Sequence, residues 1–146
     1  MGANTLIVNP NTGTTVFGTL PDLTLPGGTI IPAGDILLKE GTIWREHGGA
    51  YGGFGMKHIW KDHHIELHLH GYTSMDDVPR FVSDVIQPGS EVFYEGSRGQ
   101  RCNVLRSSLG IVILEYKINP QTQTTKHYVV SAYTRRNSRG KRVHVM

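Results

Sequence analysis

The sequence predicts an α+β domain in which two helices precede an antiparallel sheet. Residues 55–64 and 75–86 carry helical signals, and apolar runs separated by turn residues follow from residue 91 onward. Helices that precede the strands, rather than alternating with them, are typical of α+β folds. The chain of 146 residues has the length of one domain.

Residues 1–33 differ in composition from the rest of the chain. They contain little charge and many Gly, Pro, Thr and Asn residues, with short apolar runs at residues 6–8 and 14–17 around a turn. Turn residues at this spacing are typical of short extended pieces. We therefore expect residues 1–33 to form an extended lead-in or linker. The compact domain is expected to cover residues 34–146 and to begin with a strand near residues 35–39.

The first predicted helix follows a glycine-rich turn at residues 52–55. Met56, Ile59 and Trp60 recur at helical spacing, which indicates a helix over residues 55–64. Over residues 64–70 polar and apolar residues alternate, and this period is typical of a strand. Trp44 and Trp60 are expected in the core rather than as base-stacking platforms.

The second predicted helix covers residues 75–86. Ser74 is a suitable N-cap, and Asp76 and Asp77 fall in the first turn, where the helix dipole favours acidic side chains. Beyond this helix, turn signals at a spacing of about 8–12 residues predict an antiparallel sheet. Its strands are expected at Glu91–Glu95, Cys102–Arg106, Ile111–Ile118 and His127–Tyr133, with a short last strand at Val143–Val145.

The charge of the chain is distributed unevenly. Residues 1–96 carry five Lys or Arg against eleven Asp or Glu, whereas residues 97–146 carry ten Lys or Arg and one acid, Glu115. This asymmetry indicates that the C-terminal third faces a polyanion, with RNA or DNA as the first candidates. A basic surface kept for solubility and a surface that meets an acidic protein are the alternatives.

Several classes of protein are excluded by composition. The single cysteine, Cys102, excludes an internal disulfide framework and a zinc site built on several cysteines. No apolar run of about 18 residues is present, so no transmembrane helix is expected. The N-terminal residues do not have the pattern of a signal peptide.

A cluster of histidines suggests acid–base chemistry. Five of the eight histidines lie between Gly52 and Gly71, at His58, His63, His64, His68 and His70. In metal-free RNA cleavage, a base takes the proton of the 2′-hydroxyl, an acid protonates the leaving 5′-oxygen, and cations stabilise the phosphorane. Two histidines fit the acid and base roles. On one helix, however, His58 and His63 point about 140° apart, so the sheet or a helix break would have to complete the site.

Two other interpretations of the histidines remain open. On a strand, His64, Glu66, His68 and His70 would share one face and could bind a metal; if the helix continued instead, His64 and His68 would suit zinc. The HExxH motif is absent. The other interpretation is a solvent-facing edge, on which Glu66 pairs with one histidine.

The segment Gly53–His63, with its GFGxxHIxxxH pattern, resembles the C-terminal nuclease domains of bacterial polymorphic toxins. The preceding segment Gly34–Gly41 and the later segments Arg101–Arg106, Ile111–Tyr116 and Tyr128–Tyr133 extend the similarity over residues 34–146. The similarity is greatest to tRNA-cleaving toxins of contact-dependent growth inhibition systems. These belong to a group that unites barnase, EndoU, colicin and RelE ribonucleases.

The resemblance implies a small α+β ribonuclease with N-terminal helices packed on a four-stranded antiparallel sheet. It implies delivery as part of a larger toxin, tRNA cleavage in the target-cell cytoplasm without a metal or other cofactor, and a cognate immunity protein. His58 and His63 match the histidines of the family pattern, and Ser131 replaces the usual Thr while keeping the hydroxyl. Lys57 and Arg106 are added on grounds of charge. The expected catalytic residues are His58, His63, Lys57, Ser131 and Tyr133, and the expected substrate-binding residues are Arg101, Arg106, Arg135 and Arg136.

Two alternative functions are carried forward. One is a non-catalytic domain that binds nucleic acid or protein through the basic C-terminal third. The other is a metal-dependent hydrolase that uses the histidine cluster.

Overall fold

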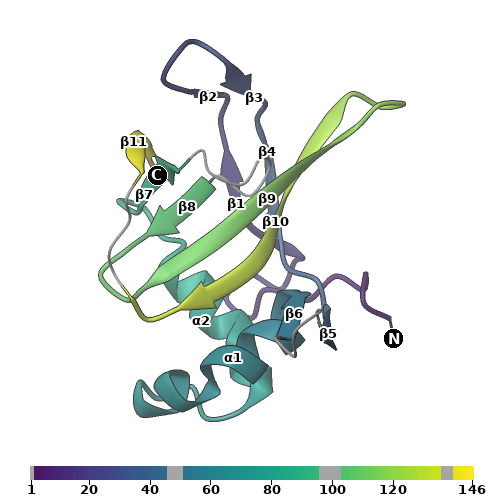
Figure 1. Cartoon of the computed structure of the whole chain (residues 1–146), viewed down its shortest axis with the longest axis vertical. Coiled ribbons are helices and arrows are strands. Elements are labelled where there is room, and N and C mark those ends of the chain that lie inside the picture. Colours follow the sequence, from purple (N-terminus) through teal and green to yellow (C-terminus); the bar gives the residue numbers. More distant parts are fainter. Residues whose placement is uncertain (1, 46–50, 96–102, 136–139) are drawn as a thin grey trace.

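The computed structural model describes residues 2–45, 51–95, 103–135 and 140–146. Within them, a curled seven-stranded sheet is packed against two helices (Figure 1). Along the sheet the strands are β1 (Val16–Leu20), β4 (Gly34–Leu37), β10 (Thr124–Tyr133), β9 (Ile111–Asn119), β8 (Asn103–Arg106), β7 (Glu91–Tyr94) and β11 (Lys141–Val145). Two small hairpins accompany it, β2–β3 (Leu23–Thr24, Ile30–Ile31) and β5–β6 (Thr42–Arg45, Tyr51–Phe54). The helices are α1 (Gly55–Leu69), the short 3₁₀ helix η1 (Met75–Asp77) and α2 (Val78–Val85).

The expected arrangement of N-terminal helices on a four-stranded antiparallel sheet, as in barnase, EndoU and RelE ribonucleases, is wrong. Six strands precede α1 in the described part of the chain, so the helices lie mid-chain. The sheet is also mixed, because β4 pairs in parallel with β10 from Gly34 opposite Thr125 to Leu37 opposite Tyr128. The error has a physical reason: β1 and β4 are short and carry little periodicity, and β4 joins the rest of the sheet through β10, which is distant in sequence.

Residues 2–33 form short extended pieces, but these pieces belong to the packed structure. Strand β1 pairs with β4 at one edge of the sheet. Phe17, Leu20, Leu23 and Ile31 are buried in the main hydrophobic core. Local composition indicated the extended conformation, whereas the apolar side chains give the segment a place in the core.

Helix α1 continues through the segment that was expected to be a strand. Ile59 and Leu67 are fully buried, whereas Ile65 and Leu69 are 71% and 78% exposed. The apolar residues that alternate with polar ones over residues 64–70 are therefore not all buried, as they would be on a strand. His63 lies four residues from both Ile59 and Leu67, on the face of the helix that packs inward.

The second half of the fold follows the sequence signals more closely. A capping box between Ser74 and Asp77 precedes α2, as the acidic first turn indicated. Strands β7, β9 and β10 occupy the predicted segments, as do the described residues of β8. The last strand, β11, begins at Lys141, two residues before the predicted start, and pairs with β7. None of the described helices is long and apolar enough to span a membrane.

Candidate active site

His63 is paired with an acid on the same helix. Its Nδ1 donates a hydrogen bond to Oε1 of Glu66, which lies about one helical turn further on. The two side chains are 24% and 35% exposed, so a ligand in solution can reach both. When Nδ1 carries the proton of the neutral ring, Nε2 is the nitrogen that accepts another.

The end of β10 supports this pair from the other side. Thr134 Oγ1 donates a hydrogen bond of 2.6 Å to Glu66 Oε2. The Tyr133 ring packs against the His63 ring at 5.0 Å between centroids, and the Arg135 guanidinium lies 5.6 Å from the Tyr133 centroid. The His63 cluster comprises His63, Glu66, Tyr133, Thr134 and Arg135.

The topology explains why these two elements meet. β4 pairs with β10 only from Thr125 to Tyr128, so no strand of the described residues pairs with the second half of β10 on that edge. α1 packs there, beneath the end of β10 in Figure 1. Because His63 is on the inward face of α1, it faces the residues that end the strand.

Glu66 is held in its charged form. Burial raises the pKa of its carboxyl. The Thr134 hydrogen bond and the charge and hydrogen bond of His63 lower that pKa by more, so the pKa of Glu66 lies below its ordinary value. An ionised carboxylate at Nδ1 fixes the tautomer of a histidine and stabilises the imidazolium that forms when Nε2 takes a proton. The pair therefore has the arrangement of an oriented general base.

Of the expected site residues, Tyr133 and Arg135 join His63. Ser131 lies on the same face of β10 as Tyr133, since the two pair with Ile113 and Ile111 of β9, but it is largely buried. It is thus a neighbour of the cluster in the sheet, with little surface for a ligand.

Arg106 shares a row of the sheet with Tyr133, because both pair with Ile111. Its guanidinium donates a hydrogen bond of 2.8 Å to Glu91 and lies 4.8 Å from the Phe93 ring centroid. Arg142 pairs with the same carboxylate at 2.9 Å. The hydrogen bonds from Arg106 and Arg142 hold the pKa of the Glu91 carboxyl below its ordinary value. Arg106 is therefore engaged in an ion pair two strands away from the His63 cluster.

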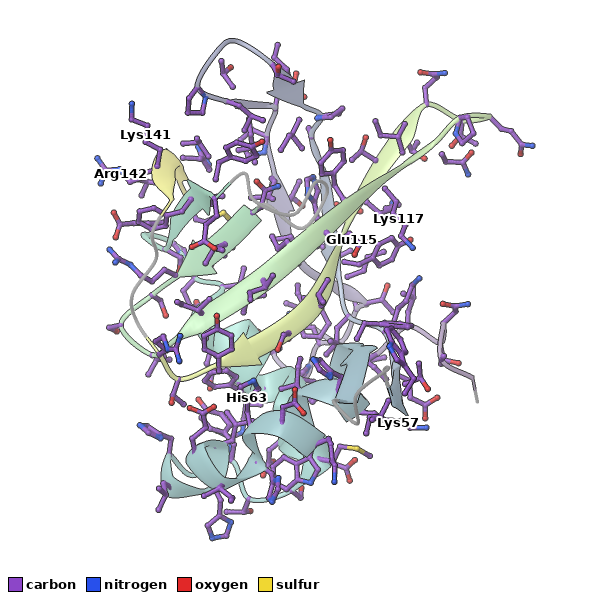
Figure 2. The ribbon with its side chains drawn as sticks, viewed as in Figure 1. Lys57, His63, Glu115, Lys117, Lys141 and Arg142 are labelled. Atoms are coloured by element: carbon purple, nitrogen blue, oxygen red, sulfur yellow. The ribbon has the colours of Figure 1, made fainter. Side chains whose placement is uncertain are left out.

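Lys57 and His58 lie apart from the His63 cluster. Lys57 Nζ is 3.9 Å from Glu40 Oε1, near the start of α1, and Figure 2 shows Lys57 and His63 in different parts of the molecule. The side chain of His58 is only 12% exposed, and its Nε2 lies 3.5 Å from Asp62 Oδ2. Because α1 does not break between His58 and His63, these histidines do not flank one phosphate.

The remaining expectations concern metals and two arginines. The helical course of residues 64–69 removes the shared strand face on which, in the alternative interpretation, His64, Glu66, His68 and His70 could bind a metal. In the described residues, no group of three or more His, Cys, Asp or Glu side chains is placed to hold a metal ion. Arg101 and Arg136 lie outside the described residues.

Two members of the His63 cluster were missed by sequence reasoning. Glu66 was expected to pair with a histidine, but its partner was not identified. The signal was available, since an acid three residues after His63 faces it once the helix is extended to Leu69. Nothing in the sequence pointed to Thr134, because its contact depends on how β10 meets α1. Comparison of the chain with protein-family models, with curated proteins and with solved structures gave no match.

Proposed function

We propose that this protein is an endoribonuclease that cleaves RNA without a metal, with His63 as the general base. The observation that carries the proposal is the His63–Glu66 pair, oriented by Thr134 and packed against Tyr133. A histidine aligned by a carboxylate, accessible to a ligand and beside an arginine, has the parts that phosphodiester cleavage requires.

The proposed reaction follows from the positions of these groups. His63 Nε2 takes the proton of the 2′-hydroxyl while the 2′-oxygen attacks phosphorus. The bond from phosphorus to the 5′-oxygen breaks, and Tyr133, whose ring packs against His63, gives that oxygen a proton. Arg135 stabilises the charge on the phosphorane. The products are a 2′,3′-cyclic phosphate and a 5′-hydroxyl, and no water is consumed.

RNA is the favoured substrate because of the charge of the chain and the chemistry of the cluster. Residues 97–146 carry ten Lys or Arg and one acid, and a strongly basic segment attracts a polyanion. Cleavage by transfer to the 2′-oxygen needs a ribose. The choice of tRNA, delivery within a larger toxin to the target-cell cytoplasm, and neutralisation by an immunity protein rest on the sequence resemblance.

The proposal and the sequence resemblance assign the proton transfer to different sets of histidines. The family pattern singles out both His58 and His63. His58 is half as exposed as His63, at 12% against 24%, and lies near Asp62 rather than near the end of β10. We therefore assign the proton transfer to His63.

The test is cleavage of a short RNA in EDTA by the wild type and by His63→Gln. Loss of acid–base catalysis is expected to slow cleavage by about 10² to 10⁴-fold. His68→Gln is the matched control, because it makes the same change at an exposed histidine of α1. A substrate with a 2′-deoxyribose at the cleaved position is expected to remain intact.

Two results would contradict the proposal. Unchanged cleavage by His63→Gln would remove His63 from the reaction. Cleavage that disappears in EDTA and returns with zinc would exclude the metal-free mechanism.

The second candidate is a non-catalytic nucleic-acid-binding domain, which the basic residues after position 97 favour. It predicts binding of RNA that weakens steeply with salt, together with intact RNA after long incubation.

A further inference from the structure

A cavity of about 300 Å³ lies between the β5–β6 hairpin and strands β9 and β10. Three aromatic side chains line it, Trp44, Phe54 and Tyr128. The rings of Trp44 and Phe54 are 6.2 Å apart between centroids and tilted by 53°. Trp44 was expected in the core, but 41% of it is exposed. An aromatic face open to solvent beside a cavity is available for stacking.

The same cavity is lined by two lysines. Lys39 Nζ lies 4.2 Å from the Tyr128 ring centroid and 5.8 Å from that of Phe54. Lys117 Nζ lies 5.9 Å from the Tyr128 centroid. Each lysine has one polar contact nearby, Lys39 with Asn4 at 3.2 Å and Lys117 with Glu115 at 4.0 Å. Two ammonium groups therefore converge on one aromatic ring.

The two cations also repel each other. Burial lowers the pKa of Lys39, the charge of Lys117 lowers it further, and Glu115 acts in the opposite direction. An anion placed between the two lysines would relieve this repulsion. Glu115 also lines the cavity, so its lining carries two positive charges and one negative charge. A nucleotide fits this lining, because its base can stack on the aromatic side chains and its phosphate can bind the lysines.

Strand β10 connects this cavity with the His63 cluster. Tyr128 pairs with Glu115, Ser131 with Ile113 and Tyr133 with Ile111, so Tyr128 and Tyr133 lie on the same face of the sheet. Because β10 has a bulge between Val129 and Ser131, the two tyrosines are as far apart as Glu115 and Ile111 on β9. Four steps along a strand span about 14 Å, a distance that a few nucleotides of single-stranded RNA can cover. Figure 2 shows Glu115 and Lys117 along the middle of β9, and His63 beneath the end of β10.

We propose that the cavity lined by Trp44, Phe54 and Tyr128 binds one nucleotide of the RNA that is cleaved at the His63 cluster. The base stacks on Trp44, and a phosphate lies between Lys39 and Lys117. This inference rests on the proposed function, because it takes the RNA substrate as the ligand. The cavity would hold the RNA at a fixed distance from the reacting phosphate and so contribute to the choice of the cleaved position.

The experiment measures binding separately from cleavage. The probe is a fluorescently labelled single-stranded RNA oligonucleotide with 2′-O-methyl ribose throughout, which lacks the attacking hydroxyl and cannot be cut. Its dissociation constant is measured by fluorescence anisotropy at several salt concentrations. Trp44→Ala is expected to weaken binding by about 5-fold or more, from the contribution of one stacked base. Trp44→Phe keeps an aromatic face and is expected to retain most of the affinity, which separates stacking from a folding defect.

The lysines are tested through the salt dependence. Lys117→Gln is expected to reduce the slope of log K against log salt concentration by about 0.7, the value for one phosphate contact in a single strand. Lys141→Gln is the matched control, since Lys141 is an exposed lysine of β11 at the far edge of the sheet. Because Lys141 belongs to the basic segment 97–146 but does not line the cavity, Lys141→Gln is expected to reduce the slope clearly less than Lys117→Gln does.

Equal affinity of Trp44→Ala and the wild type, or an equal change of slope in Lys117→Gln and Lys141→Gln, would overturn the assignment. The failure of the proposed function would be recognised independently. In that case wild-type protein would leave unmodified RNA intact, whatever the oligonucleotide binding shows.

Discussion

The substitution Glu66→Gln isolates the electrostatic part of the His63 cluster. Glutamine has the shape of glutamate, and its amide oxygen can still accept the hydrogen bond from His63 Nδ1. What is lost is the negative charge beside the imidazolium that forms during the reaction. The amide and the Thr134 hydroxyl can exchange donor and acceptor roles, so the link to β10 is kept.

The size of the effect follows from the difference between two kinds of hydrogen bond. A hydrogen bond to a charged group contributes about 1.5–3 kcal/mol, and a neutral one contributes about 0.5–1.5 kcal/mol. The difference is about 1 kcal/mol, toward the low end of these ranges because the Glu66 side chain is 35% exposed. A loss of about 1 kcal/mol in the transition state lowers kcat/KM by about 5-fold. The free energy of unfolding is expected to change little, since accessible ion pairs contribute about 0–1 kcal/mol.

The assay is kcat/KM on a short RNA with one cleavable linkage, in EDTA, with thermal unfolding of each variant measured in parallel. His68→Gln serves again as the control for a polar substitution on α1. A wild-type rate for Glu66→Gln at every pH would refute the argument, because the carboxylate would then have no part in the reaction. An equal loss of rate in His68→Gln would refute it as well, since the effect would not be specific to the cluster.

Two further predictions concern stability. His127 is fully buried, and its Nε2 donates a hydrogen bond of 3.1 Å to the Pro32 carbonyl; burial lowers its pKa although that hydrogen bond raises it. The unfolded chain therefore binds a proton that the folded chain rejects, so stability is complete above about pH 6.5 and falls below it by at most about 1.4 kcal/mol per pH unit. Urea unfolding between pH 5 and 7 is expected to give a smaller slope for His127→Gln than for the wild type, and equal slopes would contradict the assignment. Gly41→Ala is expected to destabilise the fold by more than about 2 kcal/mol, because Gly41 has φ +82° and an added Cβ would lie 1.9 Å from the Phe54 carbonyl oxygen. Gly13→Ala, with φ +77° and open space around the added Cβ, is the matched control and is expected to lose about 1 kcal/mol; similar losses in the two variants would show that the close approach of Phe54 has no effect.

The elements that the sequence predicts correctly are those with strong local periodicity. The segment that forms η1 and α2 combines Ser74 as N-cap and two acids in the first turn of η1 with the apolar stripe of α2, and each of these signals comes from residues close together in the sequence. Strands β9 and β10 have the same advantage, since long apolar runs are joined there by the turn at residues 120–123. Local signals of this kind specify an element without reference to the rest of the chain.

Pairing between distant segments is not encoded in the same way. β4 has four residues, and its parallel partner β10 lies some ninety positions later in the sequence. Nothing within Gly34–Leu37 identifies that partner, which is selected by burial of Ile36 and Leu37 and by the approach of Gly34 to Thr125. The mistaken fold class follows from this, because the number of strands and their order depend on such pairings.

Prediction of the His63 cluster depends on whether residues 64–70 are assigned a strand period or a helical period. Alternating residues 64–70 have a strand pattern only if Ile65 and Leu69 are buried, and both are exposed. Once Leu67 is recognised as the buried position, the helical face runs through Ile59, His63 and Leu67, and Glu66 falls beside His63. The same extension separates His63 from His58, whose side chain lies about 140° around the helix. The identity of the proposed base therefore depends on where α1 ends. The contact between Thr134 and Glu66 places His63 at the end of β10, where Arg135 carries a positive charge.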